Sequence, residues 1–173
     1  MKQIEKPGAN EYDPDVIKYI SLVPDDWLVL EHLQKNFEIT RDTLLFLPED
    51  KLIYSYAERK WTIKEIVQHI TDSERVYSYR ALRFARNDAT ELPGFDQDEF
   101  AAFSNANQRS IKDLLDELAS VRQATISLYQ GLSNESLLRK GIANQKVMSV
   151  RAIIYDIAGH ELWHMNIIRR LYL

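Results

Sequence analysis

The length, composition and charge of the chain exclude several classes of protein. Its 173 residues fit one domain, 1–173, and 45% are hydrophobic, as in a globular protein with a full core. The net charge of −4 argues against nucleic acid as a partner, because phosphate binding requires a basic face. The absence of cysteine excludes disulfides and a cysteine nucleophile. Because the N-terminus is polar and no apolar run reaches about 20 residues, we expect a cytoplasmic protein without membrane association.

The first half of the chain predicts an irregular segment and two helices. Residues 1–24 contain three of the five prolines and are expected to form an extended lead-in. Apolar residues at helical spacing then predict a helix over about 26–47. The second helix has the strongest start signal in the sequence, because Thr62 and Glu65 form a capping box. Its apolar face continues to about residue 86.

The second half predicts two further helices and no convincing strand. Residues 107–130 have an inward apolar face, and Gly131 follows as a stop signal. A long link precedes the last helix, which begins near Ser149 and runs almost to the end of the chain. Four amphipathic segments of about 20 residues predict an all-α protein with a four-helix bundle.

Two histidines on the last helix are candidate metal ligands. His160 and His164 are four residues apart, so both imidazoles leave the same face of the helix about 6 Å apart along its axis. They lie within the apolar stripe, where their ring nitrogens need partners. A metal ion would satisfy these nitrogens, and so would hydrogen bonds to carboxylates or carbonyls.

Residues 160–164 also spell the H-E-x-x-H pattern of zinc peptidases. A catalytic zinc takes three protein ligands plus water. The residues after His164 contain no histidine, carboxylate or cysteine to act as the third ligand. The sequence therefore argues against a peptidase, and a third ligand has to come from upstream.

The remaining histidines are His32 and His69. His69 lies beside inward-facing isoleucines of the second helix and can reach the same depth of the bundle as His160, whereas His32 is expected at the surface. A di-iron carboxylate site requires a second Glu-x-x-His motif. The corresponding segment, 65–68, ends in glutamine, so that alternative is discarded.

Three stretches of this chain resemble the DinB-like superfamily of bacterial four-helix-bundle proteins. They are "WTIKEIVQHITDSE", "LPGFDQDEF" and "SVRAIIYDIAGHELWHMNIIRRLY", and the resemblance covers about residues 26–173. It implies a DinB-like fold and a divalent metal, zinc or nickel, bound by residues that match His69, His160 and His164. It also implies a homodimer, and either hydrolysis of a small-molecule substrate or transfer of a low-molecular-weight thiol.

Several acidic residues near these histidines are candidates for supporting roles. Glu161 follows a ligand directly and is the candidate catalytic residue for proton transfer; the alternative is that it faces solvent or a neighbouring helix. Asp156 and Asp72 could each accept a ring N–H from the histidine nearest in sequence. Either could equally be a solvated carboxylate.

Two other features have both a functional and a structural interpretation. The loop "LPGFDQDEF" could form one wall of a substrate pocket, or Asp96 or Asp98 could simply cap a helical turn. Arg80, Arg83 and Arg86 could bind an anionic cosubstrate or form a solvated face. For the whole chain, the alternatives to an enzyme are a non-catalytic, metal-binding, stress-associated dimer and a helical interaction domain whose histidines only pack.

Overall fold

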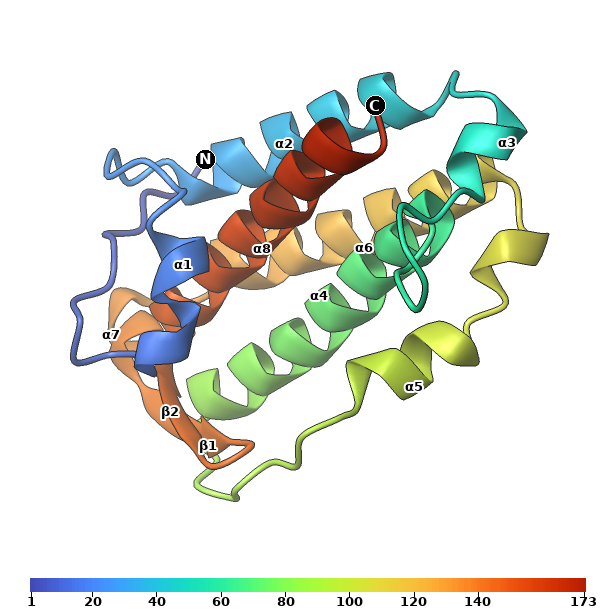
Figure 1. Cartoon of the computed structure of the whole chain (residues 1–173). Helices are drawn as coiled ribbons and strands as arrows, with labels where there is room; N and C mark the ends of the chain where they lie inside the picture. The colour runs from blue at the N-terminus through green and yellow to red at the C-terminus, as the bar shows by residue number, and fades with distance from the viewer.

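Four long helices make up the body of the computed structural model, which describes residues 1–173 (Figure 1). They are α2 (Val29–Leu44), α4 (Ile63–Ala85), α6 (Ile111–Gln130) and α8 (Val150–Leu171). Both α4 and α2 pack against α6 and α8, so the order around the bundle is α2, α6, α4, α8. The predicted all-α four-helix bundle is confirmed. No helix combines the length and apolar character that crossing a bilayer requires.

Short helices connect and flank the four long ones. They are η1 (Pro14–Val16), α1 (Ile17–Ile20), α3 (Glu49–Leu52), α5 (Gln97–Ala102), η2 (Ala106–Gln108) and α7 (Asn134–Leu138). The lead-in thus contains one helical segment, formed by η1 and α1. The helix predicted over 26–47 is shorter at both ends, and at its start Trp27 has a φ of 66°, which an α-helix does not allow.

The predicted capping box at the start of α4 is present. Thr62 Oγ1 accepts a hydrogen bond from the Glu65 backbone N–H at 3.1 Å, and the Glu65 side chain accepts one from the Thr62 N–H at 2.7 Å. These two bonds satisfy backbone donors that the first turn of a helix leaves free. They fix the start of the helix that carries His69.

The absence of strands was wrongly predicted. Residues Lys140–Ala143 (β1) and Lys146–Ser149 (β2) pair as an antiparallel hairpin directly before α8. Its two-residue turn, Asn144-Gln145, has positive φ at both positions, as a type I′ turn requires. Glutamine is uncommon in that conformation, so the turn lacks the usual glycine signal.

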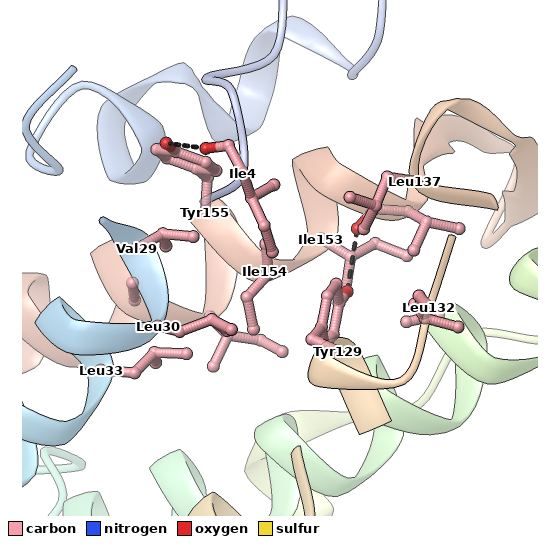
Figure 2. Close-up of a cluster of buried hydrophobic side chains, with 14 of the residues drawn as sticks. Ile4, Val29, Leu30, Leu33, Tyr129, Leu132, Leu137, Ile153, Ile154 and Tyr155 are labelled. Carbon is pink, nitrogen blue, oxygen red and sulfur yellow. Dashed lines mark hydrogen bonds between the residues drawn. The ribbon is translucent and has the colours of Figure 1, made fainter. Parts of the chain in front are cut away.

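The buried interior has two apolar clusters with a polar layer between them. The larger cluster gathers around the first half of α8 and includes Leu30, Tyr129 and Ile154 (Figure 2). The smaller cluster gathers around the start of α4 and the end of α8. Between the two, α4 and α8 bury polar side chains, namely His69, Thr71, Ser73, Glu74, Asp156, His160 and Glu161. The candidate site lies in this polar layer.

A close approach between α1 and α8 shapes one side of this layer. A Cβ at Gly159 would lie 2.0 Å from the backbone oxygen of Tyr19, so a larger residue does not fit. The contact brings the Tyr19 ring to 5.3 Å from the His160 ring in an edge-on arrangement. The lead-in therefore contributes to the surroundings of the candidate site.

Candidate metal centre

Three histidines from two helices converge inside the bundle. His69 comes from α4, and His160 and His164 come from successive turns of α8. The Nε2 atoms of His69 and His164 each lie 3.1 Å from the Nε2 atom of His160. One ligand atom from each residue lies within 4.8 Å of the others. The structure thus brings together the three histidines that the sequence selected.

The geometry of the three nitrogens fits a metal ion better than a hydrogen-bonded cluster. An imidazole Nε2 offers one in-plane position, which holds either a proton or a lone pair. His160 can therefore form a hydrogen bond with only one of its two neighbours. Nitrogens bound tetrahedrally to one zinc ion at about 2.0–2.1 Å lie about 3.3 Å apart. The two separations of 3.1 Å are close to this value, the third pair of nitrogens lies within 4.8 Å, and one ion would satisfy all three nitrogens.

The protonation state of the cluster also suits a metal. His69 and His160 are buried, and His164 is partly buried. Burial lowers the pKa of His69 to about 4 and that of His164 to about 3. Burial also lowers the pKa of His160, and the adjacent His164 and His69 lower it further. All three rings are neutral at pH 7, which is the form that binds metals.

A cavity of about 340 Å³ gives access to the cluster from one side. His164 lines it, together with side chains from the 56–61 loop, α5 and the end of α8. Trp61 also lines the cavity, and its ring lies 4.6 Å from that of His69 and 6.3 Å from that of His164. A small molecule can therefore reach the histidines along the edge of His164.

The predicted catalytic residue Glu161 does not face this cavity. Its side chain is fully buried, pairs with Arg122 at 2.9 Å and accepts a hydrogen bond from Thr40 at 2.7 Å. Arg122 also binds Glu74, with Nη2 at 2.8 Å from a carboxylate oxygen. A residue one position after His160 is rotated about 100° around the helix, which directs it to a different face of α8, toward α2 and α6. Glu161 belongs to a buried ion network, and the geometry argues against proton transfer by this residue.

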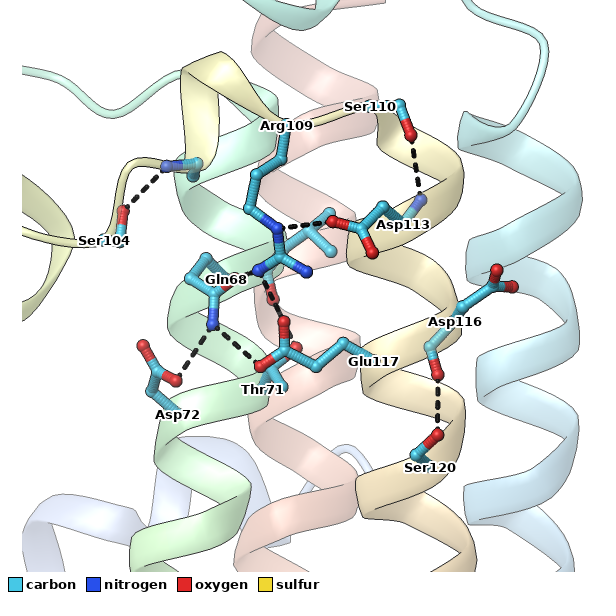
Figure 3. Close-up of polar contacts among 12 residues, drawn as sticks. Gln68, Thr71, Asp72, Ser104, Arg109, Ser110, Asp113, Asp116, Glu117 and Ser120 are labelled. Atoms are coloured by element: carbon cyan, nitrogen blue, oxygen red, sulfur yellow. Dashed lines mark hydrogen bonds and ion pairs between the residues drawn. The ribbon is translucent and has the colours of Figure 1, made fainter.

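Neither candidate acceptor for a histidine N–H takes that role. Asp72 accepts a hydrogen bond from Gln68 at 3.0 Å on the α4–α6 side of the bundle (Figure 3). Asp156 is buried, and its Oδ1 atom has no hydrogen-bond partner. His32 lies apart from the cluster, as expected, with Nε2 at 2.8 Å from Asp26.

The loop between α4 and α6 combines both interpretations of its sequence. Asp96 caps α5 by accepting hydrogen bonds from the N–H groups of Asp98 and Glu99 at 2.9 and 3.1 Å. The next two residues, Gln97 and Asp98, line the cavity beside His164. The capping turn therefore places polar side chains at the entrance of the candidate site.

Sequence reasoning missed several residues that contact the polar layer from other parts of the chain. Arg122 of α6 is 3% exposed, yet its charge gave no reason to place it inward. It follows the inward Leu118 by four residues, so its position on the apolar stripe was the available signal. Tyr19 and Trp61, which border the histidines, lie outside the long helices, where periodicity gives no information.

The fold and the converging imidazoles define a class, namely four-helix-bundle proteins with a buried three-histidine site suited to a divalent metal. The chain belongs to the DinB superfamily, whose family model matches residues 32–168. A protein of Oceanobacillus iheyensis named "Putative metal-dependent hydrolase OB0413" is 27% identical over 126 residues, which are 72% of each chain.

A solved structure supports the same fold. YfiT from Bacillus subtilis, described as a probable metal-dependent hydrolase with an unusual four-helix bundle topology, superposes with a TM-score of 0.70. The match covers 96% of this chain and 93% of YfiT, with 15% sequence identity. The DinB-like fold predicted from the sequence is thereby confirmed.

Proposed function

We propose that this chain is a metal-dependent hydrolase that acts on a small molecule. His69, His160 and His164 hold one divalent ion, zinc or nickel, and the substrate binds in the cavity beside His164. The observation that carries the proposal is the position of His160 Nε2, which lies 3.1 Å from two other imidazole nitrogens and can form a hydrogen bond with only one.

The surroundings of the ion suit this chemistry. A divalent ion held by three neutral imidazoles keeps an open position and makes a water molecule or a thiol nucleophilic near neutral pH. Arg59 and Lys60 supply positive charge to the cavity, and Tyr56, Trp61 and Tyr172 supply aromatic surface. Asp98 is the carboxylate among the lining residues and is thus placed to accept a proton from a bound substrate or water.

Transfer of a low-molecular-weight thiol is the second candidate. No carboxylate oxygen lies within the cluster of histidine nitrogens, and Glu161 is engaged elsewhere. A thiol, with a pKa near 8.5, needs less help from a protein base than water does. The chain has no cysteine, so the thiol would arrive as a cosubstrate. The homodimer stays a prediction.

Metal content tests the proposed site directly. Elemental analysis of purified protein should give about one zinc or nickel ion per chain for the wild type. His164→Ala should lose it, because two imidazoles alone bind a divalent ion weakly. The matched control is His32→Ala, which removes a histidine that pairs with Asp26 at the surface. Stoichiometric metal in His164→Ala would contradict the ligand assignment.

Activity assays then separate the functions. Metal-loaded protein should hydrolyse at least one member of a panel of small esters and amides, and chelation should abolish the activity. Conjugation of small thiols to an electrophilic dye, without hydrolysis, would establish thiol transfer instead. Bound metal with neither activity would favour the non-catalytic alternative.

A further inference from the structure

A second cavity, of about 150 Å³, lies at the hairpin end of the bundle. It is separate from the cavity beside His164 and is bounded by η1, α4, the β1–β2 hairpin and α8, all of which meet at that end of the molecule (Figure 1). Two of its lining side chains form no ion pair within the protein. They are Asp156 of α8 and Arg80 of α4.

Asp156 is an unusual group to find at this depth. Its side chain is 2% exposed, Oδ1 has no hydrogen-bond partner, and the carboxylate forms no ion pair. A buried acceptor without a partner costs about 1–3 kcal/mol, and more when it is charged. Nearly all buried polar groups in native proteins are satisfied. Burial raises the pKa of Asp156 to about 7, which is the electrostatic consequence of the same position.

Arg80 faces the cavity from the opposite helix. One guanidinium N–H donates to the Pro93 carbonyl at 2.9 Å, and the guanidinium lies 5.7 Å from the Tyr77 ring centre and 5.9 Å from that of Phe95. These contacts hold it without neutralising its charge. It forms no ion pair with Asp156, although both side chains line the cavity and each acts electrostatically on the other.

Two other cations near this cavity pair with acidic side chains. Lys146, which also lines it, pairs with Asp13 and Asp15. Arg83, one turn after Arg80 on α4, pairs with Asp88. Asp156 and Arg80 lack such a pairing, and Lys18, a further cation that acts on Asp156, lies over the Tyr19 and Trp163 rings instead.

We propose that this cavity binds a small zwitterion of the amino-acid type, with its ammonium group on Asp156 and its carboxylate on Arg80. An ammonium supplies three N–H donors to the unpartnered carboxylate, and a guanidinium binds a carboxylate through paired N–H groups. A cavity of about 150 Å³ has room for more than one water molecule, as a ligand of this kind requires. Tyr77 forms a shared wall with the metal centre, since its ring lies 6.2 Å from that of His160.

Binding can be measured by calorimetry with glycine, β-alanine and γ-aminobutyrate, which place the two charges at increasing separation. Methylamine and acetate are the single-charge controls. At least one zwitterion should bind the wild type, and Asp156→Asn and Arg80→Gln should each weaken that binding at least tenfold. Arg83→Gln, which changes the neighbouring paired arginine, should bind like the wild type. His164→Ala should also bind normally, so failure of the metal site leaves this test valid.

Thermal denaturation separates lost binding from lost folding. At pH 8, Asp156→Asn should raise the melting temperature of the ligand-free protein, because it replaces a buried negative charge with a neutral amide of nearly the same shape. Absence of binding by all three zwitterions at millimolar concentration would overturn the proposal. So would unchanged binding by Asp156→Asn, or equally tight binding of methylamine or acetate.

Discussion

Replacing Arg122 with leucine removes the one cation from a buried group of three charges. The Arg122, Glu74 and Glu161 side chains are 3%, 1% and 0% exposed. Arg122 Nε lies 3.0 and 3.1 Å from the two Glu74 oxygens, Nη2 contacts both glutamates, and Nη1 donates to the Leu33 carbonyl. The substitution leaves two carboxylates without a counter-charge inside the bundle.

The expected loss of stability is about 3–5 kcal/mol at pH 7, the usual cost of removing one partner from a buried ion pair. For a chain of this length that corresponds to a fall in melting temperature of about 6–20 °C. Leucine at all three positions removes the charges together and should recover at least half of the loss. Arg75→Leu is the control, because Arg75 also contacts two carboxylates but is 48% exposed, and it should cost less than about 1 kcal/mol.

Urea denaturation, monitored by circular dichroism, measures these differences in unfolding free energy. The pH dependence of the unfolding free energy provides a further check. In the Arg122→Leu variant the unpaired glutamates should have pKa values above their values in the unfolded chain. The native state of the variant then binds more protons than its unfolded state. The loss of unfolding free energy in the variant, relative to the wild type, should then grow as pH rises above about 4.5 and shrink at lower pH. A loss below about 1 kcal/mol at pH 7, or a triple variant no better than the single one, would refute the reasoning.

Two further predictions concern the histidines and α1. Burial lowers the pKa of His69 to about 4 and that of His164 to about 3, so their neutral rings should cost stability in metal-free protein as pH falls from about 6.5 toward 4, while the raised pKa of Asp156 acts in the opposite direction. Metal-free wild type should therefore lose more stability between pH 7.5 and 5 than metal-free His164→Ala, and an equal change in the urea midpoints of the two proteins would contradict this. Gly159→Ala should cost about 1–3 kcal/mol by forcing Tyr19 away from α8. Gly131→Ala, whose Cβ meets nothing closer than 3.6 Å, is the matched control, and an equal loss in both variants would exclude the proposed clash.

The sequence was sufficient for the features that depend on local chemistry and helical period. The capping box at Thr62 needs only residues three apart, and the shared face of His160 and His164 needs only the helical repeat. The meeting of His69 with this pair depends on how far α4 is displaced along α8. Periodicity allowed that meeting, but only the packed bundle shows the 3.1 Å separation.

The features that the sequence did not reveal depend on which helix faces which. The direction of Glu161, about 100° from His160, follows from the helical repeat, but its meeting with Arg122 requires α6 to lie on that side. The unsatisfied Asp156 is likewise a property of its tertiary neighbours. The hairpin turn at Asn144 was missed because tertiary contacts, including the Leu92 N–H bond to Ile142 O, stabilise a turn without glycine.

Burying the charges of Arg122, Glu74 and Glu161 costs desolvation energy. The position of this ion network beside the metal centre suggests what it contributes. Buried ion pairs contribute little net stability, but they fix geometry. The peptide bond between His160 and Glu161 joins the two sites, so a Glu161 carboxylate held by Arg122 and Thr40 fixes the rotation of α8 about its axis. That rotation sets the direction of both histidines on α8. Arg122→Leu should therefore weaken metal binding more than Arg75→Leu does, even at temperatures where both variants are fully folded.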